Sequence, residues 1–445
     1  MKDILIAARR ILIGLTAVVA WSVSNAQAMD IKRVVSARGI EAWLVQDASI
    51  PVISFKFSWR AGAAHDPKGK EGRASMLSAL LDEGAGDLDS QAFQRRLEDL
   101  SVRLRFSANT DTFRGNLRTL STNRDEAFRL LALAVNQPRF DAEPVERIRA
   151  QLVAGLKASQ EDPDTIATRT WYRTAFPEHP YGRPSGGTVE SVGTVTVADL
   201  KDFTARYFVR KGLVIGVAGD ITSQELALRL DEVFGRLPMS LPVEAVPEVQ
   251  PSNAGKIIVV KRDVPQSVVL FGQAGIKRDD SDWYAAYVMN RILGGGGFSS
   301  RLMEEVREKR GLAYSVYSYL SPFEHSALYM GGVGTANARV AESLKIIRTE
   351  WQRMGEKGVT EKELASAKTY INGSFPLRLD STRRIAGILV GVQISRLGID
   401  YIGKRARLID AVTTRDIRRV AKRLLHPRAL TVVVVGKPEG LEATK

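Results

Sequence analysis

The sequence of 445 residues contains no cysteine and few histidines. Without cysteine the chain can form no disulfide bond, no thiolate metal site and no cysteine nucleophile. The histidines are scattered, and none lies at metal-ligand spacing from another: His65, His179, His325 and His426. A histidine-based zinc site is therefore not visible in the sequence.

Long hydrophobic runs are also missing, apart from one stretch near the N-terminus. Residues 1–28 combine a basic start, an apolar stretch at 11–21 and an Ala-x-Ala pattern at 26–28, which together are typical of a cleaved secretory signal peptide. The apolar stretch is short for a membrane-spanning helix, and the cleavage pattern disfavours the alternative of an uncleaved anchor. We therefore predict a mature protein that begins near Met29, keeps no membrane anchor and resides in the periplasm or outside the cell.

Lysine and arginine outnumber the acidic residues by 64 to 50, which gives a formal net charge of +14. An excess of this kind can indicate a partner such as nucleic acid or an acidic membrane. No dense basic run is interleaved with aromatic residues, however, and we interpret the charge as an ordinary solvated surface. Nucleic acid is therefore not a predicted partner.

The order of predicted elements occurs twice along the chain. In each half, apolar strand-like runs are followed by a helix, a hairpin, a series of helices and a final buried strand. Gly62 corresponds to Gly275 and Gly219 to Gly436 at nearly equal separations, which indicates a duplicated unit. Helices are predicted at 71–85, 91–100, 124–136, 144–159, 163–176, 197–207, 282–293, 298–310, 340–354, 361–377 and 381–396.

A proline-rich segment separates the two halves and predicts a stiff, extended linker. We therefore expect an α+β protein with two homologous domains, at 30–245 and 252–445. Each domain should contain a mostly antiparallel sheet covered by helices, and the two should form a clam-like cavity. A cavity of this kind is the default place for a ligand.

Several motifs occur in the same order as in a known enzyme family. They are SWRAGAAHDPKGKEGRASMLSALLDEGAG at 58–86, HPYGRPSGGT at 179–188, VAGDIT at 217–222 and GGGGFSSRLMEEVREKRGLAYSV at 294–316. With these motifs the chain resembles the pitrilysin/insulinase family of zinc peptidases, in the branch that includes the mitochondrial processing peptidases. The resemblance covers nearly all of the predicted mature chain.

The resemblance implies a zinc-binding helix at 71–85, but the ligands are absent. Catalytic family members carry His-x-x-Glu-His there, with both histidines on one helix face and the glutamate as general base. The corresponding residues are Ser75, Ser78 and Ala79, and none of them can replace a histidine or a carboxylate. The third ligand, a glutamate on a later helix, corresponds to Gly155. We therefore predict that this chain binds no zinc through the family's site and has no cofactor of its own.

A second pair of functional positions is kept. Family members use an arginine and a tyrosine from the C-terminal half to grip the substrate backbone and stabilise the oxyanion, and Arg307 and Tyr314 match them. A guanidinium offers several fixed donors, and a phenol donates one hydrogen bond to the oxygen as charge develops on it. Both residues could instead have a purely structural role. Tyr314 could pack within its strand, and the positive charge of Arg307 is favourable near a helix C-terminus.

The run Gly294, Gly295, Gly296 and Gly297 lacks the Lys-Ser/Thr ending of a phosphate-binding loop. In the processing-peptidase relatives, a glycine-rich segment of the non-catalytic subunit is associated with substrate access. The resemblance therefore implies a substrate-binding role for these four residues. The structural alternative is a flexible turn between helices.

These observations lead to the hypothesis of a non-zinc-binding subunit of a heterodimeric zinc metalloendopeptidase that degrades peptides or unfolded segments. A homologous partner would supply His-x-x-Glu-His, the third glutamate and the zinc, and this chain, inactive alone, would supply Arg307 and Tyr314. The alternative is a non-catalytic scaffold or peptide-binding module related to processing-peptidase and respiratory core subunits. A self-sufficient serine hydrolase is disfavoured, because Ser75 and Ser78 lack the Gly-x-Ser-x-Gly motif.

Overall fold

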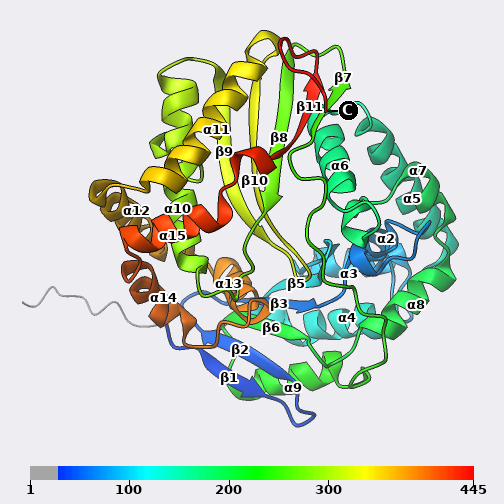
Figure 1. The fold of residues 1–445 in the computed structure, drawn as a ribbon. Helices are drawn as coiled ribbons and strands as arrows, with labels where there is room; N and C mark the ends of the chain where they lie inside the picture. Colours follow the sequence, from blue (N-terminus) through cyan, green and yellow to red (C-terminus); the bar gives the residue numbers. More distant parts are fainter. Residues whose placement is uncertain (1–28, 445) are drawn as a thin grey trace, which may run out of the picture.

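The computed structural model describes residues 29–444, so that the predicted signal peptide at 1–28 lies outside the described residues. Two sheets with surrounding helices form the molecule (Figure 1). One sheet comes from the first half of the chain and the other from the second half. The predicted α+β class with two helix-covered sheets is thereby confirmed.

The first sheet has the strand order β1-β2-β6-β3-β5-β4. Its β2–β6 pair is parallel and its other pairs are antiparallel, as expected for a mostly antiparallel sheet. The strands are β1 (Lys32–Val35), β2 (Glu41–Gln46), β3 (Val52–Trp59), β4 (Arg103–Ala108), β5 (Phe113–Leu120) and β6 (Val214–Gly219).

The second sheet repeats this arrangement without a counterpart of β1. Its order is β7-β11-β8-β10-β9, which matches β2-β6-β3-β5-β4 strand for strand, and its β7–β11 pair is again the parallel one. The duplication that the glycine spacing predicted is therefore present in the topology. The strands are β7 (Ile257–Lys261), β8 (Gln266–Ala274), β9 (Ala313–Pro322), β10 (Ala327–Ala336) and β11 (Thr431–Gly436).

Helices from the same half cover one face of each sheet and enclose an aromatic core. In the first core, the rings of Phe55 on β3 and Phe128 on α4 lie 5.1 Å apart. In the second, Phe271 on β8 lies 5.6 Å from Trp351 on α11. The helices of the first half are α2 (Arg73–Leu80), α3 (Ser90–Asp99), α4 (Arg124–Asn136), α5 (Ala142–Ala158), α6 (Pro163–Ala175), α7 (Val189–Thr194), α8 (Val197–Tyr207) and α9 (Ser223–Phe234). Those of the second are α10 (Trp283–Leu293), α11 (Val340–Lys357), α12 (Glu361–Gly373), α13 (Thr382–Ile394), α14 (Tyr401–Asp410) and α15 (Thr414–Leu424).

The opposite face of each sheet is covered by a helix from the other half (Figure 1). Helix α6 of the first half packs on β8 and β11, and α13 of the second half packs on β3 and β6. The indole N–H of Trp171 on α6 donates to the carbonyl of Thr431 at 3.1 Å. In the same way, the side-chain amide of Gln393 on α13 donates to the carbonyl of Ile215 at 2.8 Å. This reciprocal exchange of helices joins the two halves through buried side chains.

Three predicted helices differ in extent from those observed. The helix predicted at 71–85 ends at Leu80, because the chain turns through Gly84 and Gly86, whose φ values are 108° and 59°. The helix predicted at 298–310 is instead a 3₁₀ turn at Gly297–Ser299 and a π-helical turn at Met303–Glu308. The helix predicted at 361–377 ends at Gly373.

The sequence prediction also missed α7, α9, α14 and α15. Three of them begin with a capping box, and in two of these the third helical residue is acidic, a pattern that was readable in the sequence. Thr222 and Glu225 form it in α9, and Thr413 and Asp416 form it in α15. Within residues 29–444, none of the helices is both long and apolar enough to span a membrane.

The proline-rich linker forms no helix or strand and is fixed to both halves by hydrogen bonds. Its Val249 N–H donates to the carbonyl of His325 at 2.9 Å, and its Ser252 N–H donates to the carbonyl of Ala175 at 2.8 Å. The carbonyl of Pro247 lies 3.0 Å from Nε2 of His179. The domain boundaries at 30–245 and 252–445 stay a prediction.

Candidate functional site

Helix α2 carries the positions of the degenerate zinc site, and its start is fixed by a buried carboxylate. Gly72 precedes the helix with a φ of 94°, a conformation that favours glycine. The Asp66 carboxylate accepts the N–H groups of Gly72 at 3.0 Å and Ala74 at 3.1 Å. Burial raises the pKa of Asp66 to about 7, against the opposing effect of the neighbouring Arg73. The loop and the first turn of α2 thus form one connected unit.

The structure places all four degenerate positions on two helices that pack against each other. Ser75, Ser78 and Ala79 are half-buried on α2, and the Ser78 hydroxyl donates to the carbonyl of Ser75 at 2.8 Å. Gly155 is exposed on α5, and a Cβ added there would meet no atom within 4 Å. Space for a larger side chain therefore exists at Gly155, but no zinc ligand occupies any of the four positions.

The residues around α2 do not fit a metal ion. Across residues 29–444, no group of three or more histidine, cysteine, aspartate or glutamate side chains is arranged to hold one. Beside α2, the Glu83 carboxylate lies 2.6 Å from the guanidinium of Arg147 on α5 and accepts the Ser90 hydroxyl at 2.6 Å. This carboxylate is committed to an ion pair, so that it offers no replacement ligand.

Arg307 and Tyr314 lie together on the surface of the second half. Arg307 belongs to the π-helical turn, and Tyr314 is the second residue of β9. The guanidinium carbon of Arg307 lies 5.1 Å from the centroid of the Tyr314 ring and 4.6 Å from that of Phe298. Both rings are open to solvent, with 79% of Tyr314 and 70% of Phe298 exposed. Each cation–π contact contributes about 0.5–1 kcal/mol at an exposed site, and both restrict the position of the guanidinium.

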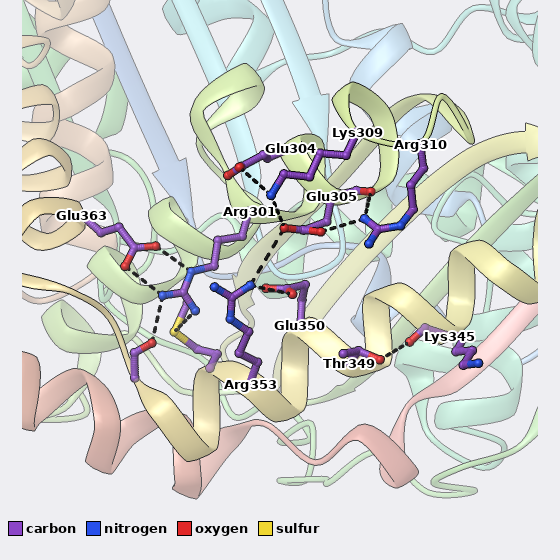
Figure 2. Close-up of polar contacts among 12 residues, drawn as sticks. Arg301, Glu304, Glu305, Lys309, Arg310, Lys345, Thr349, Glu350, Arg353 and Glu363 are labelled. Atoms are coloured by element: carbon purple, nitrogen blue, oxygen red, sulfur yellow. Dashed lines mark hydrogen bonds and ion pairs between the residues drawn. The ribbon is translucent and has the colours of Figure 1, made fainter.

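Ion pairs brace the turn that carries Arg307 (Figure 2). Arg301 is only 8% exposed, and its guanidinium contacts the two carboxylate oxygens of Glu363 at 2.7 and 2.9 Å. It also donates to the carbonyl of Gly358 at 2.9 Å. Although burial acts in the opposite direction, the hydrogen bonds from Arg301 and Thr360 lower the pKa of Glu363 to about 2. The start of the turn is thereby tied to α12.

A second set of ion pairs in Figure 2 ties the same turn to α11. Glu305 lies 2.7 Å from Lys309 and 2.7 Å from Arg310, and 4.0 Å from Arg353 on α11. Arg353 is in turn held by the buried Glu350 at 3.2 Å. Single-turn π-helices occur frequently at functional sites, and the ion pairs around this one fix the backbone from which Arg307 projects.

The Gly294–Gly297 run forms a close-packed turn directly before Phe298, one of the two rings that contact Arg307. The N–H of Gly294 donates to the carbonyl of Asn290 at 3.0 Å, and its own carbonyl accepts the N–H of Ser318 on β9 at 3.2 Å. A Cβ added at Gly294 would lie 2.4 Å from the Ser318 hydroxyl, and Gly297 has a φ of 56°. Packing and backbone conformation thus require glycine here, and the turn leads directly into Phe298. The substrate-binding role of the four glycines stays a prediction.

The sequence-predicted residues therefore form two groups. Figure 1 draws α2 and α5 on the right of the molecule and α10 and β9 on its left, so that the degenerate positions and the Arg307/Tyr314 pair belong to separate regions. Sequence reasoning missed Phe298, which completes the cluster around Arg307. An aromatic residue directly after the glycine run was the available signal.

Comparison with protein families gives two adjoining matches. Residues 45–189 match the model of insulinase (peptidase family M16), and residues 194–371 match the model of the peptidase M16 inactive domain. Among curated proteins, the chain is similar to the non-peptidase homolog YmxG of Helicobacter pylori, with 31% identity over 332 residues, 74% of this chain and 76% of that protein. It is also similar to an uncharacterized zinc protease of Streptomyces coelicolor, with 28% identity over 337 residues, 74% of this chain and 72% of that protein.

Solved structures share the whole architecture. A crystal structure of a peptidase M16 inactive domain from Pseudomonas fluorescens has a TM-score of 0.86 and 28% identity, and covers 94% of this chain and 100% of that one. A chain of complex III2 from Candida albicans has a TM-score of 0.77 and 19% identity, over 93% of this chain and 98% of that one. At this low identity the second likeness shows the fold alone.

Proposed function

The chain belongs to the insulinase family of peptidases, family M16, and we propose that it is the non-zinc-binding subunit of a heterodimeric zinc metalloendopeptidase. A homologous partner with His-x-x-Glu-His would bind the zinc, and this chain would contribute Arg307 and Tyr314. Two findings support a chain that is not a peptidase by itself. These are the match to the model of the inactive domain and the similarity to a protein named as a non-peptidase homolog.

The observation that carries the proposal is the exposed cluster of Phe298, Arg307 and Tyr314. Large aromatic side chains are often buried, so that two solvent-exposed rings that both contact one guanidinium suit contact with another molecule. Several buried or half-buried charges, in the ion pairs of Arg301 and Glu305, fix this one turn. A surface that only stabilises the fold has no need of such an arrangement.

The chemistry of the cluster suits a peptide in the course of hydrolysis. The Arg307 guanidinium can donate two hydrogen bonds to backbone carbonyl groups and so hold an extended peptide in register. The Tyr314 hydroxyl can donate to the oxygen of the scissile carbonyl, and this bond strengthens as negative charge develops there. One such donor is worth roughly 3 kcal/mol in the transition state. Phe298 limits the movement of Arg307 and offers an apolar surface to a substrate side chain.

The substrates in this proposal are peptides or unfolded segments, and the site of action is the periplasm. The location depends on the signal-peptide pattern at 1–28. The glycine turn at 294–297 leads into Phe298 and would line the approach to the Arg307/Tyr314 pair. The partner is expected to be encoded near this gene and to carry its own signal peptide.

The deciding experiment compares this chain alone with the purified pair. We expect no peptide hydrolysis from this chain, weak hydrolysis from the partner alone and strong zinc-dependent hydrolysis from the two together. Metal analysis should find zinc in the partner and not in this chain. Strong zinc-dependent hydrolysis by this chain alone would refute the proposal.

A non-catalytic scaffold is the second candidate, and the similarity to a protein named as a non-peptidase homolog favours it. The two candidates differ in what they require of Tyr314. If Tyr314→Phe leaves the turnover of the purified complex unchanged while the complex stays assembled, the scaffold is the better description.

A further inference from the structure

A cavity of about 780 Å³ lies away from the Arg307 turn, between α6, the segment that follows His179 and the β9–β10 turn. Its lining contains three arginines and one acidic residue, Asp164. Tyr172, Tyr181 and Phe323 also line it. A cavity that combines several guanidinium groups with aromatic rings is suited to an anionic ligand that also has an apolar part.

Helix α6 supplies two of the arginines from a rigid position. Ala167, Trp171 and Ala175 are fully buried along one side of this helix, where it crosses the second sheet. Arg169 and Arg173 are four residues apart and therefore share another side, which lines the cavity. Because the buried side locks the helix, the two guanidinium groups are displayed by an element that need not be ordered when a ligand binds.

The third arginine and the aromatic floor come from other elements. Arg183 lines the cavity from the segment after Tyr181. The Tyr181 hydroxyl donates to Asp111 at 2.7 Å and accepts the N–H of His325 at 2.9 Å, which fixes the ring. Phe323 lies with its centroid 5.0 Å from the ring of Tyr181 and 6.1 Å from that of Tyr172. The floor is thus a continuous aromatic surface built from both halves of the chain.

The positive charges at this cavity are incompletely neutralised. Arg183 lies 3.6 Å from the carboxylate of Glu71. Arg169 and Arg173 form no ion pair with any acidic residue in the described range 29–444, although Arg169 donates to the Ser159 hydroxyl at 3.4 Å. On α5, in contrast, Arg147 lies 2.6 Å from the carboxylate of Glu83 and Arg149 lies 3.2 Å from that of Glu146. Two unpaired guanidinium groups on one rigid face are therefore available to an external anion.

We propose that this cavity binds a peptide carboxylate, either the C-terminal group or an aspartate or glutamate side chain, with the adjoining apolar side chain on the aromatic floor. Arg169 and Arg173 hold the carboxylate, and Tyr172 and Phe323 contact the apolar part. The volume of about 780 Å³ falls within the usual range of about 300–1,000 Å³ for small-ligand pockets, which fits a subsite rather than a site for a folded partner. The inference does not depend on the proposed peptidase function, because binding is a property of this chain alone.

The test measures binding of fluorescent hexapeptides to the isolated chain by anisotropy. One peptide ends in leucine with a free carboxylate, the second is its C-terminal amide, and the third is the amide with an internal glutamate. We expect the free carboxylate or the glutamate peptide to bind at least tenfold more tightly than the plain amide. Arg169→Gln combined with Arg173→Gln should remove this difference, and the preferred peptide identifies which carboxylate the cavity takes.

A matched control is available on α15, where Arg415 and Arg418 are exposed and line a separate basic hollow. Arg415→Gln with Arg418→Gln removes the same charge and should leave peptide affinity unchanged. Equal loss of affinity in both double variants would show a general effect of the net positive charge and would overturn the proposal. Inorganic phosphate that displaces the peptide at equal molar concentration would also overturn it, because the aromatic floor would then contribute nothing. Circular dichroism confirms that each variant is folded.

Discussion

The two halves of this chain have the same sheet order and the same kind of crossing helix, but they present different reactive side chains. In the first half, α2 offers only Ser75, Ser78 and Ala79 where catalytic relatives bind zinc. In the second half, Arg307 and Tyr314 stand together on an exposed and well-braced turn. The first half lacks the residues that bind zinc in catalytic relatives, and the second half contains the pair that we propose to bind a carbonyl oxygen.

The comparison shows that the scaffold and the chemistry can change independently. Each half packs an aromatic residue of its sheet against one of its own helices, with Phe55 against Phe128 in the first half and Phe271 against Trp351 in the second. The zinc-site positions lie on half-buried or exposed faces of α2 and α5, where small residues replace larger ones at little cost in packing. The absence of zinc ligands in the first half is therefore compatible with an intact fold, and it does not disturb the Arg307 turn of the second half.

The largest effect is expected where the halves exchange helices. Trp171→Ala should lower the free energy of unfolding by about 3–5 kcal/mol, because it removes a fully buried indole and its hydrogen bond to Thr431. Leu389→Ala, at the crossing of α13, should lower it by about 2–5 kcal/mol. Urea unfolding followed by circular dichroism measures both values. Leu228→Ala on the exposed face of α9 is the control and should change stability by less than about 0.5 kcal/mol. If only one of the two variants, Trp171→Ala on α6 or Leu389→Ala on α13, lowers the free energy of unfolding, the two crossing helices do not contribute equally to stability.

The next largest effect concerns the Arg307 cluster of the second half. In the complex with its partner, Tyr314→Phe should lower kcat about 100-fold, or about 2.7 kcal/mol, without changing zinc content. Tyr317→Phe, on the same strand and also exposed, is the matched control and should leave kcat unchanged. Steady-state kinetics on a fluorogenic peptide checks both. Equal losses in the two variants would contradict a specific role for Tyr314.

The third effect concerns the degenerate zinc site of the first half, which should bind zinc again once the missing ligands are restored. Ser75→His, Ser78→Glu, Ala79→His and Gly155→Glu together should raise zinc affinity at least tenfold, or about 1.4 kcal/mol, because α2 and α5 already pack against each other. Zinc retained after dialysis, measured by mass spectrometry, is the readout. The variant with Ser75→His alone is the control and should retain no zinc. If the fourfold variant folds but binds no zinc, then α2 and α5 do not place the four side chains close enough together to bind one ion.

The smallest effect is a pH dependence at the brace of the Arg307 turn. The pKa of Glu363 in the folded protein is lowered to about 2 from an ordinary value of 4.5, so that its stabilising contribution is present above pH 4.5 and is lost as the pH falls towards 2. Glu363→Gln should therefore lower the free energy of unfolding by about 1 kcal/mol at pH 7 and by progressively less below pH 4. Urea unfolding at pH 7, 4 and 3 measures the difference. Glu342→Gln, at an exposed position of α11, should show no such trend.

Much of the fold could be predicted from local patterns. Alternating apolar residues identified the strands of both sheets, and the paired glycines identified the duplication, because each reflects the conformation of a few neighbouring residues. Helices α7, α9, α14 and α15 were missed, although Thr413 and Asp416 signal the start of α15. The helix predicted at 298–310 was wrong in type. Its π-helical turn and the residue Arg301 before it form ion pairs with α11 and α12, which lie far along the chain and which a local pattern does not record.

The candidate site was predictable in its chemistry but not in its surroundings. Side-chain identity alone showed that Ser75, Ser78 and Ala79 cannot hold zinc, and that Arg307 and Tyr314 can donate to an oxygen. The position of Phe298 against Arg307 followed only from the way the glycine turn packs on β9.

By itself, the sequence determined which chemical groups this protein has and where its repeating units begin and end, because both are properties of residues and of short segments. Only the tertiary structure decided that α6 and α13 cross to the opposite sheets, that one guanidinium contacts two exposed rings, and that Arg169 and Arg173 line a cavity with an aromatic floor. The physical reason is that such contacts join residues far apart in the chain, and their energies come from packing and charge pairing that no local pattern records.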